Sequence, residues 1–168
     1  MNINLKNFFR RAKLYTAISV TLLSTNAAIS APALADIYTN FSGNTCRAQA
    51  GFNASNLSQY KLEVANEFYN GIIGVICPIT KSEKDADPSR TSTYLSVQYH
   101  NFSLTGITLN CHSTATDYYG NLIDQKNIQP IVPVGRGYIS MTLKKGDVYG
   151  LMCNLPKGIG IVSYSIAY

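Results

Sequence analysis

Two histidines and their neighbours are the first residues to consider for catalysis. His100 and His112 are the only imidazole bases in the chain, and His112 is followed by Ser113 and, five positions on, by Asp117. These are the residue types of a Ser-His-Asp triad, but adjacency in sequence does not create triad geometry. His100 falls on the polar side of an alternating strand pattern, where we expect a solvated histidine.

Paired carboxylates are the second candidate for chemistry. Glu63 and Glu67 could flank a sugar as the acid and nucleophile of a glycosidase, although two Glu at this spacing are more often surface charge. The chain contains no G-x-S-x-G elbow, no H-E-x-x-H helix and no phosphate loop. We therefore expect no cofactor and no enzyme, and a hydrolase acting on extracellular material is the third of three functional hypotheses.

Four cysteines indicate disulfide bonds. Their number is even and no C-x-x-C pair occurs, so zinc binding, the rival explanation, has little support and no metal site is expected. Four cysteines allow three pairings; we prefer the one in which each bond closes a moderate loop between neighbouring strands. That pairing is Cys46–Cys77 with Cys111–Cys153.

Tyrosines provide the best candidates for binding. The chain has twelve and no Trp, and Tyr118-Tyr119 precede a predicted turn at Gly120-Asn121. Two adjacent aromatic side chains at a turn cannot easily both face inward. With Asp117 and Asn121, an exposed ring could stack on a sugar or anchor a partner protein. The alternative is a turn in which one ring folds over the sheet edge.

The first 35 residues have the pattern of a cleavable signal peptide. All four cations in this segment lie in its first thirteen residues, and residues 14–35 are uncharged, with Ala33-Leu34-Ala35 as the cleavage signal. We expect cleavage after Ala35, a single domain at 36–168, and a secreted or periplasmic protein. The uncharged stretch is too rich in Ser and Thr for a stable membrane anchor, so no membrane span is expected in the mature form.

Removal of the signal segment changes the charge of the protein. The full chain has 14 Lys and Arg against 9 Asp and Glu, for a net charge of +5. The signal segment holds four of these cations and no acid, so the remainder is almost neutral. The mature chain has no concentrated basic surface, and we expect no nucleic-acid partner.

Apolar residues after the signal alternate with polar ones in short runs, which predicts strands. The expected strands are 71–79, 93–102, 106–111, 138–143, 147–155 and 162–168, with 57–69 the ambiguous segment, favoured as strand. Gly and Asn-rich turns separate them. This pattern predicts an all-β fold, an antiparallel β-sandwich that is jelly-roll-like or immunoglobulin-like.

One short motif occurs twice. Residues 74–79 (GVICPI) and 150–155 (GLMCNL) share the order Gly, two apolar residues, Cys, any residue, Ile or Leu. The repetition indicates either two related half-domains or two similar strands, and six residues do not decide between these explanations.

These motifs together resemble a set of uncharacterised small secreted bacterial proteins. The shared features are the signal peptide, four cysteines on Cys-Pro and Cys-x-Leu-Pro strands, and a terminal Ser-Tyr-x-Ile-x-Tyr-like strand. Here they are Cys46, Cys77-Pro78, Cys111, Cys153-Asn154-Leu155-Pro156 and residues 163–168 (SYSIAY). The resemblance implies a β-sandwich and no particular activity.

The sequence thus favours an exported, non-enzymatic binding or surface-interaction domain whose partner is an extracellular or envelope protein or glycan. The second hypothesis is a structural subunit of a pilus-like surface assembly. It rests on the alternating C-terminal residues Val162, Tyr164, Ile166 and Tyr168, which could complete a neighbouring subunit by strand addition. An ordinary final strand that closes the core explains the same pattern.

Overall fold

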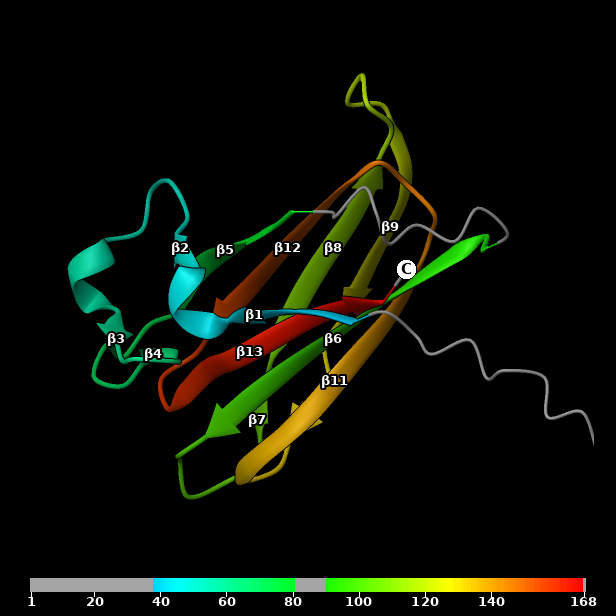
Figure 1. Ribbon diagram of the computed structural model, residues 1–168. Coiled ribbons are helices and arrows are strands. Elements are labelled where there is room, and N and C mark those ends of the chain that lie inside the picture. The colour runs from blue at the N-terminus through cyan, green and yellow to red at the C-terminus, as the bar shows by residue number, and fades with distance from the viewer. Residues whose placement is uncertain (1–37, 81–89, 168) are drawn as a thin grey trace, which may run out of the picture. The chain divides into compact units, whose positions relative to one another are not determined.

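The computed structural model describes residues 38–80 and 90–167 (Figure 1). These residues belong to one compact unit, Asp36–Tyr168. The predicted signal peptide and its cleavage site lie outside the described residues. Within the two described ranges, no helix is long and apolar enough to cross a membrane.

Strands dominate the described chain, and nine of the thirteen are at least three residues long. In chain order they are β1 (Tyr38–Ser42), β2 (Arg47–Ala48), β3 (Ser58–Gln59), β4 (Val64–Asn66), β5 (Ile73–Ile79), β6 (Ser92–Asn101), β7 (Ile107–Thr108), β8 (Asn110–Thr116), β9 (Leu122–Ile128), β10 (Ile131–Val132), β11 (Gly135–Lys144), β12 (Val148–Leu155) and β13 (Ile159–Ala167). Two short 3-10 helices, η1 (Gly43–Thr45) and η2 (Ala54–Asn56), lie among the first strands.

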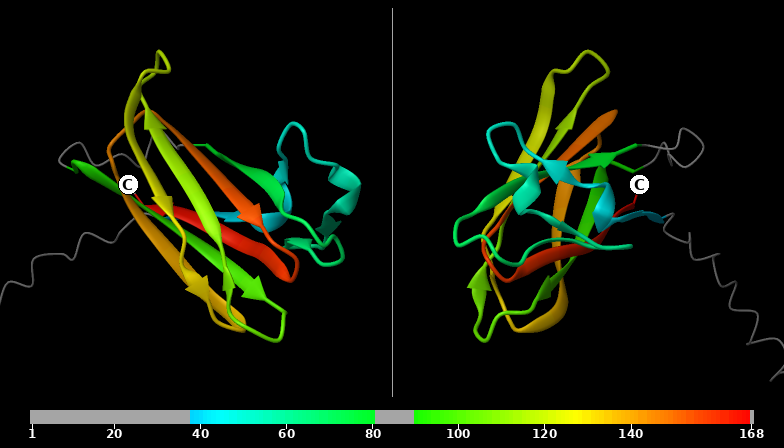
Figure 2. Two further views of the ribbon diagram at one scale, coloured as in Figure 1. Left: turned by 180° about the vertical axis from the view of Figure 1, so that it is seen from behind. Right: turned by 90° about the vertical axis from the view of Figure 1, so that its left-hand side faces the viewer.

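Two antiparallel sheets form a sandwich, which confirms the predicted fold class. The first, here called sheet A, has the order β11-β6-β13-β4-β3, with β1 also paired to β13. The second, sheet B, has the order β2-β5-β12-β8-β9. Figure 1 shows β13, β6 and β11 of sheet A in front, and the reverse view in Figure 2 brings β8, β9 and β12 of sheet B forward. Strands β7 and β10 form a separate two-stranded ribbon.

The core lies between the sheets and follows the predicted alternation. On β6 the side chains of Leu95, Val97 and Tyr99 are buried, whereas the intervening residues are not. Strand β12 does the same with alternate residues that include Leu151 and Leu155. Removing one fully buried Leu side chain from such a core costs about 2–5 kcal/mol, because the transfer free energy is lost and a cavity remains.

Both disulfides of the preferred pairing are present. Cys46, which follows η1, bonds to Cys77 on β5, and Cys111 on β8 bonds to Cys153 on β12. All four side chains are buried. Cys111 and Cys153 are directly opposite in the β8–β12 ladder, so this bond links two strands that already pair.

Two predicted strands are shorter than expected. The run 106–111 is divided between β7 and β8, because Pro130 accepts a hydrogen bond from the Leu109 N–H but has no N–H of its own to continue the ladder. The segment 57–69 contains only β3 and β4. Leu62 and Phe68, whose apolar character favoured a longer strand, are exposed outside β4.

Candidate functional site

The outward face of sheet B carries a groove. Side chains that alternate with the buried core residues of β5, β12 and β8 point away from the other sheet, and this face is toward the viewer in the left panel of Figure 2. The strand register aligns Ile76, Met152, His112 and Asn127 in one row across four strands. At about 4.8 Å between strands, the row is about 14 Å wide.

Two adjoining depressions, each of about 270 Å³, share His112 and Met152 on this face. We call them together the amide groove. The first depression is lined by Ile76, His112, Thr114, Gly150, Leu151 and Met152. The second is lined by Gln49, Asn110, His112, Asn127, Met152 and Asn154.

Two glycines on the outward face of sheet B leave open space where a larger residue would place a side chain. Gly150 lies on β12 beside Thr114, and a Cβ built on it would lie 2.8 Å from Thr114 Oγ1. Gly74 lies on β5 under the loop that follows β2, and a Cβ there would lie 2.6 Å from Gln49 Oε1. A glycine inside a strand often marks such a close approach of other groups. The missing side chains leave room for the first depression and let Gln49 approach the second.

The polar side chains of the amide groove are free to bind a ligand. Among the described residues, the side chains of Asn110, Asn127 and Asn154 have no hydrogen-bond partner. The buried Asn66 differs in part: its Nδ2 donates to the backbone oxygens of two other residues at 2.9 Å, whereas its Oδ1 is buried without a partner. The groove therefore presents several unused donor and acceptor pairs to solvent.

Several polar side chains on the outward face of sheet A bond to one another. Gln98 Nε2 donates to Tyr138 Oη at 3.0 Å, and Gln98 Oε1 accepts from Ser163 Oγ at 3.0 Å. His100 Nδ1 lies 3.4 Å from Glu63 Oε1 on the same face. The contrast between the two faces makes sheet B the better candidate for a binding surface.

The lining of the amide groove is uncharged apart from the ionisable ring of His112. None of its lining residues is an acid, a lysine or an arginine. Arg47 is the nearest cation in the register, opposite Ile76 on β2, and its Nη1 donates to Asn44 O at 2.6 Å and to Cys46 O at 3.0 Å. These properties suit a neutral ligand that is rich in hydroxyl or amide groups.

The predicted tyrosine site lies at the tip of the β8–β9 hairpin, which extends beyond β12 in Figure 2. Tyr118 and Tyr119 are 83% and 88% exposed, and their rings meet edge to face with centroids 5.9 Å apart. The alternative in which one ring folds over the sheet edge is therefore wrong.

Asp117 and Asn121 hold the turn at this tip. Asn121 donates its backbone N–H and its Nδ2 to the Asp117 carboxylate at 2.8 and 2.7 Å. The side-chain bond from Asn121 is the main reason that the pKa of Asp117 is lowered, and backbone N–H groups add to it. These two residues therefore position the tyrosines, and their role in ligand binding stays a prediction.

The structure separates the residues considered for catalysis. Ser113 is buried and its Oγ donates to Met141 Sδ, whereas His112 is on the opposite face of β8, so the two do not form a triad. Glu67 accepts hydrogen bonds from Tyr60 Oη and Ser58 Oγ. In residues 38–80 and 90–167, no group of three or more His, Cys, Asp or Glu side chains could hold a metal ion.

The two disulfides lie on the core side of sheet B and hold in place the strands that carry the amide groove. Cys111 lies between Asn110 and His112 in sequence, and Cys153 lies between Met152 and Asn154. Their bond therefore holds β8 and β12 together directly behind the second depression.

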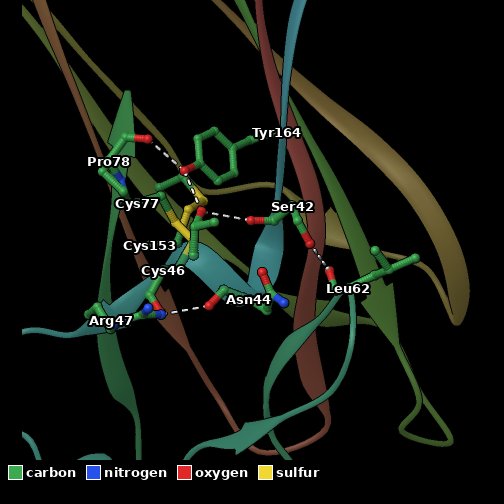
Figure 3. The surroundings of a disulfide bond; sticks show 11 residues. Ser42, Asn44, Cys46, Arg47, Leu62, Cys77, Pro78, Cys153 and Tyr164 are labelled. Carbon is green, nitrogen blue, oxygen red and sulfur yellow. Dashed lines mark hydrogen bonds between the residues drawn. A yellow bond between two sulfur atoms is a disulfide. The ribbon is translucent and has the colours of Figure 1, made fainter. Parts of the chain in front are cut away.

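The second bond, Cys46–Cys77, lies next to Cys153 in Figure 3. In the same view Tyr164 Oη donates to Pro78 O at 2.6 Å.

Sequence reasoning placed the binding residues at the tip and missed the amide groove. A signal was present in the repeated motif, because its two glycines are Gly74 and Gly150 of the groove. The two copies are neighbouring antiparallel strands of one sheet, β5 and β12, which supports the explanation of two similar strands.

No protein-family model and no curated protein matches the sequence. Solved structures do resemble the fold. The C-terminal CBM6 of the laminarinase LamC from Zobellia galactanivorans is 9% identical with a TM-score of 0.46, over 79% of this chain and 100% of that one. A family 35 carbohydrate binding module from Clostridium thermocellum is 9% identical with a TM-score of 0.45, over 77% and 97%. TM-scores below 0.5 mark a distant likeness in fold.

Proposed function

We propose that this protein is an exported, non-catalytic domain that binds a neutral glycan in the amide groove. The observation that supports the proposal best is the set of unpaired amide side chains, Asn110, Asn127 and Asn154, on one face of a rigid sheet. An amide offers a donor and an acceptor side by side, which matches a pair of neighbouring sugar hydroxyls. Met152 and Ile76 supply apolar surface for the C–H groups of a sugar ring.

The lining also supports binding without hydrolysis. Glycosidases of the common type need two carboxyl groups at the scissile bond, and no residue that lines the amide groove is an acid. Export is supported by the signal-like N-terminal sequence and by two buried disulfides, which form and persist in oxidising compartments. The destination we propose is the periplasm or the extracellular medium.

The exposed tyrosines extend this proposal. Outward-facing residues on β8 continue from Asn110 to Thr116, and the strand then leads into the turn with Tyr118 and Tyr119. Six residues of strand span about 20 Å, so a chain of several sugars along β8 would end near the tip. We propose that one of these rings provides a stacking platform at that end.

The hypothesis of a pilus-like subunit receives no support from the C-terminal strand. β13 pairs with β6 along one edge and with β4 and β1 along the other. Its backbone groups are therefore already used inside this domain. Strand addition to a second subunit would first require these ladders to break.

The test is binding of neutral hexasaccharides to the purified, disulfide-bonded protein by isothermal titration calorimetry. The double variant Asn110→Ala/Asn154→Ala removes two free amides from the groove, and at about 1 kcal/mol for each hydrogen bond we expect an affinity loss of about 30-fold. The matched control is Ser96→Ala on the outward face of sheet A, which should bind as the parent does. The proposal fails if no neutral glycan binds, or if the double variant binds as well as the parent.

A further inference from the structure

The two halves of the amide groove differ in chemistry. The depression over Gly150 is mainly apolar, with the outward side chains of Ile76 and Met152 in its lining, and Thr114 and His112 add polar atoms. The other depression is lined chiefly by amide side chains. Because the depressions share His112 and Met152, the apolar and the polar half are neighbours on one sheet face.

An unsubstituted hexose would not fill both halves. Its ring edge carries hydroxyl groups, which lose hydrogen bonds to water when they enter an apolar depression. Its C–H faces usually lie on aromatic rings, and no aromatic residue other than His112 lines either depression. The depression over Gly150 therefore requires a small substituent that has an apolar end and a polar base.

Resting on the proposed function, we propose that the depression over Gly150 binds the acetamido group of an N-acetylhexosamine, and that the ligand is a chain of such sugars. The acetyl methyl group contacts Ile76 and Met152. The amide meets the Thr114 hydroxyl and the His112 ring at the polar rim. The remaining hydroxyls of the sugar face the second depression, with Asn110 and Asn154.

The glycine in the floor of this depression supports the assignment. A Cβ at position 150 would point into the space beside Thr114 Oγ1, at 2.8 Å, and would occupy the site that we assign to the acetyl group. The neighbouring strand positions in the same row are Pro78 and Thr114, so Gly150 is the low point between two larger side chains.

The test compares chitohexaose with cellohexaose, which differ only in the acetamido or hydroxyl group at carbon 2. Calorimetry on the disulfide-bonded protein should give a preference for chitohexaose of about 20-fold, from one buried methyl group and one added hydrogen bond. Soluble glycan strands from peptidoglycan form a third arm. Tighter binding of these strands than of chitohexaose identifies peptidoglycan as the source of the N-acetylhexosamine, and the reverse order identifies a chitin-like chain.

Two variants test the geometry. Thr114→Val keeps the shape and removes the hydroxyl, so it should weaken chitohexaose binding several-fold and leave cellohexaose binding unchanged. Gly150→Ala should abolish the preference. The matched control, Thr142→Val, is exposed on β11 of sheet A and should change neither affinity. A urea unfolding curve for each variant verifies that it is folded.

The outcomes separate the two proposals. Equal affinity for the two hexasaccharides, or a preference for cellohexaose, overturns the acetamido assignment and leaves neutral-glycan binding standing. Retention of the full preference by both groove variants also overturns the assignment. Failure of every neutral glycan to bind overturns both proposals.

Discussion

The disulfide behind the groove allows a prediction with an internal control. We compare Cys111→Ala/Cys153→Ala with Cys46→Ala/Cys77→Ala. Both bonds are buried, so each double variant loses similar packing. Only the first bond links the two strands, β8 and β12, that carry the centre of the amide groove.

The expected loss of stability follows from loop closure. The bonds join residues separated by 31 and 42 positions. In the chain-entropy relation each bond then contributes about 4 kcal/mol, and the two contributions differ by only about 0.3 kcal/mol. With a urea m-value of about 2 kcal/mol/M, each double variant should unfold at a midpoint lower by about 2 M.

The assay is urea unfolding followed by native-state hydrogen exchange. The two unfolding midpoints should agree closely, whereas exchange in the β8–β12 ladder should increase more in the Cys111/Cys153 variant than in the Cys46/Cys77 variant. Unfolding free energies that differ by more than 2 kcal/mol would refute the loop-closure account. Equal exchange in the β8–β12 ladder of both variants would refute a local role for the bond behind the groove.

Two further predictions concern the tyrosine in the core and the acid at the hairpin tip. Tyr164→Phe removes the hydroxyl that bonds Pro78 O and Thr45 Oγ1 at 2.6 and 2.8 Å. The unfolding free energy measured in urea titrations should therefore fall by about 1–2 kcal/mol. An unchanged unfolding free energy contradicts this role. The lowered pKa of Asp117 means that its contribution to stability is present above the ordinary value of about 3.9 and is lost as the pH falls through the lower, folded-state pKa. In an NMR titration the Asn121 amide signals should move with a midpoint below that ordinary value, and a midpoint at or above it contradicts the proposed bonds.

The sequence was sufficient for the fold class because one physical rule dominates it. A strand with one buried face alternates apolar and polar residues, and β6 and β12 show this alternation over most of their length. The same rule placed Cys111 and Cys153 on the inward faces of their strands, and both are buried. It failed in the segment 57–69, where exposed Leu62 and Phe68 imitate a strand pattern that the core does not use.

The amide groove could not be predicted in the same way, because its residues come from separate strands. Asn110, Asn127 and Asn154 are each ordinary polar residues on the outward side of an alternating pattern. They become a site only through the register that places β8 between β12 and β9. Sequence alternation tells which face a residue occupies and does not tell which strand lies beside it.

The composition of the groove also limits how it binds. Free amides on a sheet face are hydrated in the unbound protein, so a ligand must replace each water bond with one of equal quality before it gains affinity. Neutral groups lose less on this exchange than charges do, which favours a neutral glycan over an ionic ligand at Asn110, Asn127 and Asn154. The net gain in binding free energy then comes from apolar contact at Ile76 and Met152. A second contribution is the rigid strand pair, which needs no ordering on binding. Each sugar contributes little by this mechanism, and affinity should increase with the number of sugars that lie along β8.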